Sequence, residues 1–92
     1  MKKAAKFVLQ GTVQGVFFRQ FIKAKAELLK LTGFTRNLAN GSVEVIVEGE
    51  GNNIETFAKL LKEGPEHASI RNMQAEERKW SGEFKEFKAL RF

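Results

Sequence analysis

Apolar residues in this 92-residue chain recur at the spacing of a strand in some segments and at the spacing of a helix in others. The order of these segments limits which folds the chain can adopt. The helical spacing of three and four residues predicts a first helix at residues 19–31. A second helix is predicted to begin at a cap on Asn52 or Asn53 and to stop at residues 64–65, Gly-Pro.

The remaining apolar segments alternate as strands do, and they are residues 4–10, 34–39, 43–49, 70–79 and 84–92. Asn40-Gly41 between the second and third strands is typical of a two-residue type I′ hairpin. The order strand, helix, strand, strand, helix, strand, with a short strand appended, is that of the split βαβ arrangement. We therefore expect a single α+β domain over residues 1–92: a ferredoxin-like sandwich with an antiparallel sheet of four or five strands and both helices on one face.

Composition excludes several classes of function. The chain contains no cysteine, which removes disulfides, thiol nucleophiles and Cys-based zinc sites together. Charges or amides interrupt every apolar stretch well before the about 20 residues of a membrane span, so we expect a cytoplasmic protein without membrane contact. The formal net charge of +5 favours anionic partners without choosing among them.

The segment GTVQGVFFR, residues 11–19, joins the first strand to the first helix and is suited to binding an anion. Backbone N–H groups at a helix N-terminus lack intrahelical partners and lie at the positive end of the helix dipole. Gly15 allows close approach of the backbone, and Arg19 offers a fixed fork of donors to phosphate oxygens. The segment lacks the GK[ST] of a nucleoside triphosphate loop. The spacing alone is equally compatible with an ordinary turn and an exposed arginine.

Together with GFTRNLANGSVEVIVEG, residues 33–49, this segment closely resembles the two signatures of the acylphosphatase family. The resemblance is specific over residues 11–49 and extends more loosely to most of the chain. It implies that Arg19 is the phosphate-binding arginine and that Asn37 orients the attacking water. It also implies that a phosphate cradle is formed by Gln14, Gly15, Val16, Phe17 and Phe18.

The chemistry of these residues fits acyl phosphates better than phosphate esters. Phosphoryl transfer depends mostly on positioning and charge stabilisation, which an arginine and backbone amides can supply. A neutral asparagine is no general base, but an acyl phosphate expels a carboxylate whose conjugate acid has a pKa of about 4, so no general acid is needed. Neither segment contains a histidine or a cluster of metal ligands, and we expect hydrolysis without metal or cofactor, with inorganic phosphate as product and inhibitor.

Two positions depart from the family pattern. Thr35 stands where a small apolar residue is usual, on the same strand face as Asn37, and we expect its hydroxyl to bond the backbone or a polar neighbour. Lys30 stands where a glycine often ends the first helix, and a left-handed lysine would cost roughly 1 kcal/mol, so the helix is expected to terminate differently.

Three other residues near or beyond these motifs receive structural interpretations. Phe17, like Phe18, is interpreted as a packing residue, and the alternative that Phe17 lines the acyl-group side of the site stays open. Arg36 is expected to point away from Asn37, to the solvent side of its strand. His67, far from both motifs, is interpreted as a solvated loop residue.

Two other functions are compatible with this order of elements. RNA-recognition modules share it, but their central strands carry aromatic residues, whereas SVEVIVEG has none, so we expect no nucleic-acid partner. A non-catalytic phosphate- or effector-binding domain is the other alternative, and the presence of both Arg19 and Asn37 argues against it. We expect the enzyme to be a monomer.

Overall fold

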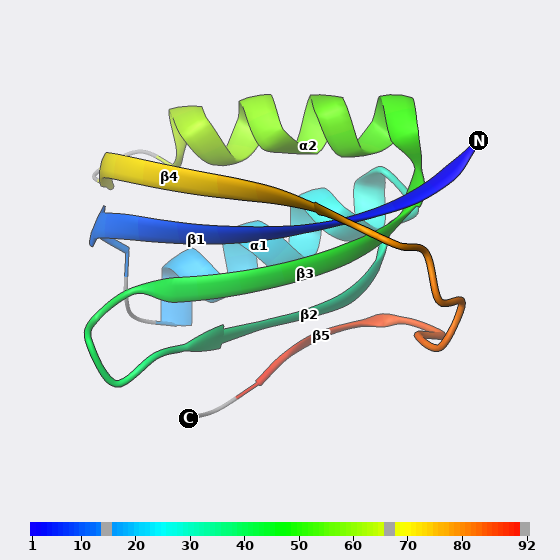
Figure 1. The fold of residues 1–92 in the computed structure, drawn as a ribbon. Helices are drawn as coiled ribbons and strands as arrows, with labels where there is room; N and C mark the ends of the chain where they lie inside the picture. Colours follow the sequence, from blue (N-terminus) through cyan, green and yellow to red (C-terminus); the bar gives the residue numbers. More distant parts are fainter. Residues whose placement is uncertain (14–15, 66–67, 91–92) are drawn as a thin grey trace.

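The computed structural model describes residues 1–13, 16–65 and 68–90, and its elements follow the predicted order (Figure 1). They are β1 (Lys2–Thr12), α1 (Val16–Leu28), β2 (Thr32–Asn37), β3 (Val43–Glu50), α2 (Gly51–Glu63), β4 (Ser69–Arg78) and β5 (Phe87–Ala89). The α+β ferredoxin-like fold is confirmed. Among these described residues, neither helix is long and apolar enough to cross a membrane.

The sheet has five strands in the order β4-β1-β3-β2-β5. The pairs β4-β1, β1-β3 and β3-β2 are antiparallel, but β5 runs parallel to β2. The expectation of a wholly antiparallel sheet is therefore wrong for the last strand. The reason lies in the connection between β4 and β5. Because β4 runs opposite to β2, reversing the chain at the end of β4 sends β5 in the same direction as β2 (Figure 1).

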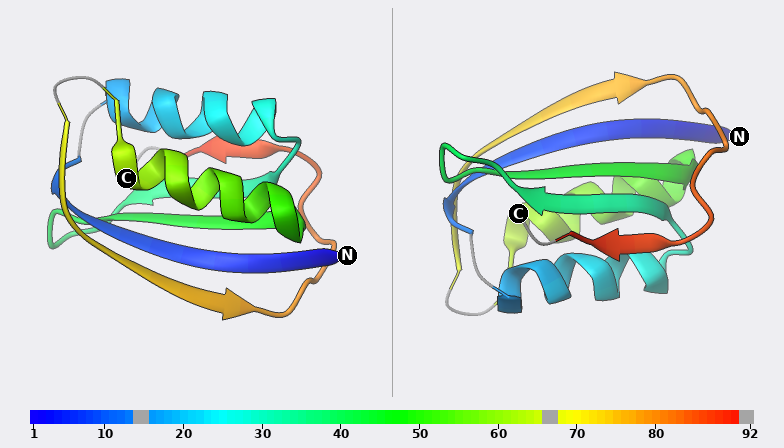
Figure 2. Two further views of the ribbon diagram at one scale, coloured as in Figure 1. Left: turned by 90° about the horizontal axis from the view of Figure 1, so that it is seen from above. Right: turned by 90° about the horizontal axis from the view of Figure 1, so that it is seen from below.

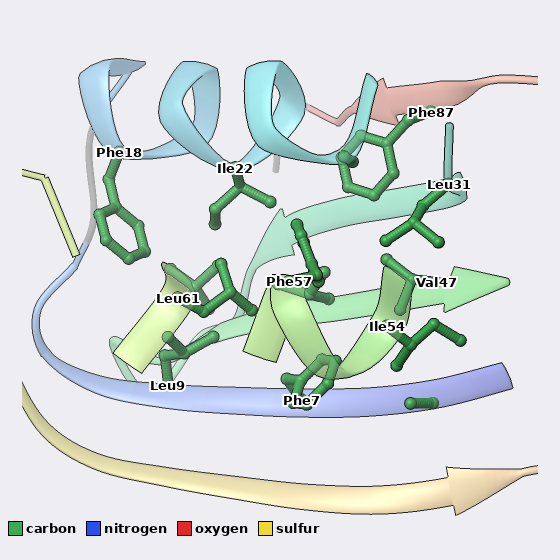
Figure 3. Close-up of a cluster of buried hydrophobic side chains, with 14 of the residues drawn as sticks. Phe7, Leu9, Phe18, Ile22, Leu31, Val47, Ile54, Phe57, Leu61 and Phe87 are labelled. Carbon is green, nitrogen blue, oxygen red and sulfur yellow. The ribbon is translucent and has the colours of Figure 1, made fainter. Parts of the chain in front are cut away.

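Both helices cover the same face of the sheet, as expected (Figure 2). The core between the layers is apolar, and its side chains from the helices and strands point toward one another (Figure 3). Its largest members include Phe7, Leu9, Ile22, Phe57 and Leu61. Alternate residues of β3 are fully buried against the helices, which confirms the apolar face predicted for that strand.

Helix α1 occupies Val16–Leu28, earlier at both ends than the predicted residues 19–31. It ends because Lys30 does adopt the left-handed conformation, with φ of 56°, so the expectation of a different ending is wrong. The Leu31 N–H donates to the Ala26 carbonyl at 2.8 Å and the Lys30 N–H to the Glu27 carbonyl at 3.0 Å. These two hydrogen bonds are the pattern of a Schellman motif, which satisfies carbonyls that the helix end would otherwise leave free.

The cap predicted for α2 is also wrong. Glu50 is the N-cap residue, its side chain makes no capping hydrogen bond, and the two asparagines lie inside the first turn. Strand β3 runs directly into α2, and the Gly51 N–H donates to the Met1 carbonyl at 3.0 Å. The predicted stop is confirmed, because Gly64 has φ of 72° and its N–H donates to the Leu60 carbonyl.

The β2–β3 hairpin is present, but its turn is not the predicted type I′. Gly41 has positive φ, whereas Asn40 does not. The Gly41 N–H donates to the Leu38 carbonyl at 3.1 Å, and the Leu38 N–H donates to the Ser42 carbonyl at 2.8 Å, which closes a three-residue loop. The Asn40 side chain accepts the Ser42 N–H at 3.0 Å, a local bond that favours this alternative.

The first and last strands of the chain also differ from the predicted ranges. Strand β1 continues past Gly11 through an irregularity in its pairing with β4, so this glycine does not end the strand. Within the described residues strand β5 spans Phe87–Ala89, so it begins later than the predicted start at residue 84. The connection before it is fastened to the open face of the sheet by Glu48, whose carboxylate accepts hydrogen bonds of 2.7–2.9 Å from Ser81 and Gly82.

Candidate active site

The two residues assigned to catalysis from the sequence lie at the same end of the sheet. Val43 of β3 pairs with Leu9 of β1 on one side and with Asn37 of β2 on the other, so Asn37 is level with the end of β1. Paired residues of antiparallel strands share a face, which places Asn37 with Val43 on the face that the helices cover. Arg19 lies in the first turns of α1, which follows the end of β1 (Figure 1).

Arg19 is held by the C-terminal segment. Its Nη1 donates to the Leu90 carbonyl at 2.8 Å, and the Leu90 N–H donates to the Thr35 carbonyl at 2.8 Å. Two hydrogen bonds therefore connect the guanidinium to β2, two residues before Asn37. Sequence reasoning missed Leu90, because a backbone carbonyl contributes through its position and carries no side-chain signal.

Two buried polar atoms of the site have no hydrogen-bond partner within the described part of the chain. They are Nε of Arg19 and Oδ1 of Asn37. Buried donors and acceptors are nearly always satisfied, because leaving one unmade costs about 1–3 kcal/mol. A guanidinium N–H can donate to a phosphate oxygen, and an amide oxygen can accept a hydrogen bond from water. The site thus offers a free donor and a free acceptor of the kinds that phosphoryl transfer to water requires.

The structure describes part of the predicted phosphate cradle. Val16, Phe17 and Phe18 form the first turn of α1, where backbone N–H groups have no intrahelical partner. Gln14 and Gly15 lie outside the described residues. Phe18 is a packing residue as expected, 4% exposed and stacked on Phe21, whereas Phe17 is 84% exposed, so its interpretation as a packing residue is wrong.

Two other residues singled out in the sequence, Arg36 and Thr35, both bond to Glu44 on the neighbouring strand. Arg36 points away from Asn37, as predicted, and its Nε donates to Glu44 at 2.7 Å. The fully buried Thr35 hydroxyl donates to the Glu44 carbonyl at 3.1 Å, which confirms that it bonds the backbone. His67 lies outside the described residues. Within the described ranges no three His, Cys, Asp or Glu side chains are grouped so as to hold a metal ion.

Comparisons with known proteins agree on one family. A family model described as acylphosphatase matches residues 5–89. An acylphosphatase of Alkalilimnicola ehrlichii is 43% identical over 74 residues, which are 80% of this chain and 83% of that protein. The crystal structure of an acylphosphatase from Bacillus subtilis superposes with a TM-score of 0.90 at 28% identity, covering 98% of this chain and 99% of the other. An acylphosphatase structure from Coxiella burnetii gives a TM-score of 0.89 at 36% identity, covering 97% and 93% of the two chains.

Proposed function

The chain belongs to the acylphosphatase family and hydrolyses acyl phosphates, and from this premise we propose that Arg19 and the cradle amides hold the phosphoryl group while Asn37 orients the attacking water. The observation that carries this assignment is the pair of buried, unpartnered atoms, Nε of Arg19 and Oδ1 of Asn37, in the described structure. A phosphoryl oxygen would satisfy the first and a water molecule the second. The cradle is proposed to comprise residues 14–18.

Each group has a distinct part in the reaction. With Nη1 engaged by Leu90, Arg19 presents a fixed N–H to the phosphoryl oxygens, and the amides at the start of α1 add further donors. Asn37 accepts a hydrogen bond from the water, whose oxygen attacks phosphorus as the bond from phosphorus to the acyl oxygen breaks. The carboxylate leaves without receiving a proton, and both protons of the water remain on the product phosphate.

The reaction requires no group beyond those of the chain and the water. Hydrolysis proceeds without a metal ion or organic cofactor, because the leaving carboxylate is stable as an anion and the arginine supplies the positive charge. The enzyme acts as a monomer in the cytoplasm. Sedimentation analysis at micromolar concentration should give the mass of one chain, and cell fractionation should recover the protein with the cytoplasmic fraction.

The test is hydrolysis of benzoyl phosphate by the purified protein with a chelator present. Arg19→Ala should lower kcat and raise KM, with a loss of at least about 100-fold in kcat/KM, because one group serves both binding and the transition state. Asn37→Ala should lower kcat by a similar factor and leave competitive inhibition by inorganic phosphate intact, since only the water loses its orientation.

Two exposed residues of β4 provide matched controls. Arg71→Ala and Asn72→Ala remove the same side-chain types from the sheet edge and should retain wild-type kinetics. Near-normal turnover by Arg19→Ala would contradict its assignment. An equal loss of phosphate binding in Asn37→Ala would show that this side chain contacts the phosphate rather than the water, and dependence on an added metal would contradict the metal-free reaction.

A further inference from the structure

Phe17 combines an unusual exposure with a position inside the proposed site. Its side chain is 84% exposed, and among the described large apolar side chains only that of Met1, at the chain terminus, is more exposed. Its neighbour Phe18 is 4% exposed and belongs to the core. An aromatic side chain in water contributes nothing to the packing of the fold, so packing does not explain a phenylalanine at this position. Phe17 lies in the first turn of α1, where the phosphate cradle is proposed.

The helix directs Phe17 and Arg19 to different sides of the cradle. Successive residues of an α-helix are rotated by about 100°, so these two side chains leave α1 about 200° apart. Arg19 faces β5, as its hydrogen bond to Leu90 shows, and it lines a groove between α1 and residues 86–90. Phe17 therefore projects from the opposite flank of α1, away from the groove that Arg19 lines.

The direction of the reaction relates Phe17 to the acyl group, and this step rests on the proposed function. In an in-line displacement the attacking water and the leaving oxygen lie on opposite sides of phosphorus. The water is held by Asn37, at the end of β2 on the face beneath the helices. The acyl group then lies on the other side of phosphorus from Asn37, which is the side of the first turn of α1 in the proposed cradle. Phe17 is the exposed apolar side chain there.

We propose that Phe17 contacts the acyl group of the substrate and gives the enzyme a preference for acyl phosphates with aromatic or large apolar acyl groups. The contact buries an exposed ring against the acyl group and removes apolar surface of both from water. A small acyl group such as acetyl covers little of the ring. Phe17 is therefore a specificity residue, distinct from Arg19 and Asn37, which act on the phosphoryl group common to all substrates.

The test compares benzoyl phosphate with acetyl phosphate in the same variants. Phe17→Ala should lower the ratio of kcat/KM for benzoyl phosphate to kcat/KM for acetyl phosphate about fivefold, mainly through the KM for benzoyl phosphate. Phe17→Trp should retain the wild-type ratio. Leu28→Ala removes another exposed apolar side chain, 69% exposed, from the far end of the same helix and should leave the ratio unchanged.

The outcomes separate this inference from the assignment of the site. A Phe17→Ala enzyme with the wild-type ratio would overturn the acyl contact while leaving the roles of Arg19 and Asn37 intact. Full activity in Arg19→Ala would overturn the site and the acyl contact together. An equal fall of the ratio in Leu28→Ala would also overturn the contact, since a general effect of helix α1 would then explain the change.

Discussion

At the scale of single residues, Arg19 divides its guanidinium between the fold and the site. One nitrogen is bound to the Leu90 carbonyl, and Nε is left for a ligand within the described structure. This division requires the planar fork of arginine, because a lysine offers one ammonium and cannot hold the same two directions. The hydrogen bond from Nη1 to Leu90 restricts the rotamers of the Arg19 side chain before substrate binds, so the Nε–H is already oriented.

Thr35 shows how a polar residue is accommodated beside the site. Its hydroxyl is fully buried and donates to the Glu44 carbonyl at 3.1 Å. Thr35→Val keeps the shape and removes this bond, and it should lower the free energy of unfolding by about 1 kcal/mol in urea denaturation while kcat stays near the wild-type value.

Thr32→Val is the matched control for that change. Thr32 is on the same strand, and its hydroxyl donates to the Glu48 carbonyl at 3.4 Å in a half-buried position. This longer and more solvent-exposed hydrogen bond should contribute less to the free energy of unfolding than the bond of Thr35. A larger loss of stability from Thr32→Val than from Thr35→Val would contradict this account of the buried hydroxyl.

At the scale of elements, the end of α1 contains a correctable strain. Lys30 has φ of 56° at the position where the Schellman motif favours glycine. Lys30→Gly should raise the free energy of unfolding by about 1 kcal/mol, because glycine has no Cβ to clash in the left-handed region. Lys59→Gly, on the exposed side of α2, should instead lower it by about 1 kcal/mol. Destabilisation by both changes, measured by urea unfolding, would show that Lys30 is not strained.

The connection from β4 to β5 depends on a buried carboxylate. Glu48 is 4% exposed and accepts hydrogen bonds from Ser81 N–H, Ser81 Oγ–H and Gly82 N–H. Glu48→Gln replaces one accepting oxygen with a donor, so at least one bond should be lost and the free energy of unfolding should fall by about 2 kcal/mol.

Glu83→Gln tests the same change at an exposed position of that connection. It should alter the free energy of unfolding by less than about 0.5 kcal/mol. Equal effects of the Glu48 and Glu83 substitutions in thermal unfolding would mean that the bonds to Ser81 and Gly82 do not hold the connection against the sheet.

At the scale of the whole molecule, ligand binding and folding should be linked. Inorganic phosphate that binds only the folded protein should raise the free energy of unfolding by about 2.7 kcal/mol at a concentration 100-fold above its Kd. Calorimetry should show a higher midpoint with phosphate than with chloride at equal ionic strength. The increase should vanish in Arg19→Ala and persist in Arg71→Ala, and a shift retained by Arg19→Ala would place the phosphate elsewhere.

Much of the molecule follows from local patterns. The order of elements, the helix stop at Gly64 and the apolar face of β3 were predictable, because periodicity and turn chemistry act within a few residues. The type I′ turn failed for a local reason, the Asn40 side chain, and the α2 cap failed because β3 leads directly into the helix. The parallel pairing of β5 depends on the direction of β4 and β2 across the sheet, which no local pattern contains.

The sequence by itself determined the fold class and the chemical types present at the site, because periodicity, glycine placement and the two motifs are properties of neighbouring residues. Tertiary structure alone decided that Leu90 anchors Arg19, that Glu48 holds the last connection and that Phe17 is exposed while Phe18 is buried. These features join residues far apart in the chain or depend on the rotation of a helix against the sheet. Their energies come from contacts that exist only once the layers have packed.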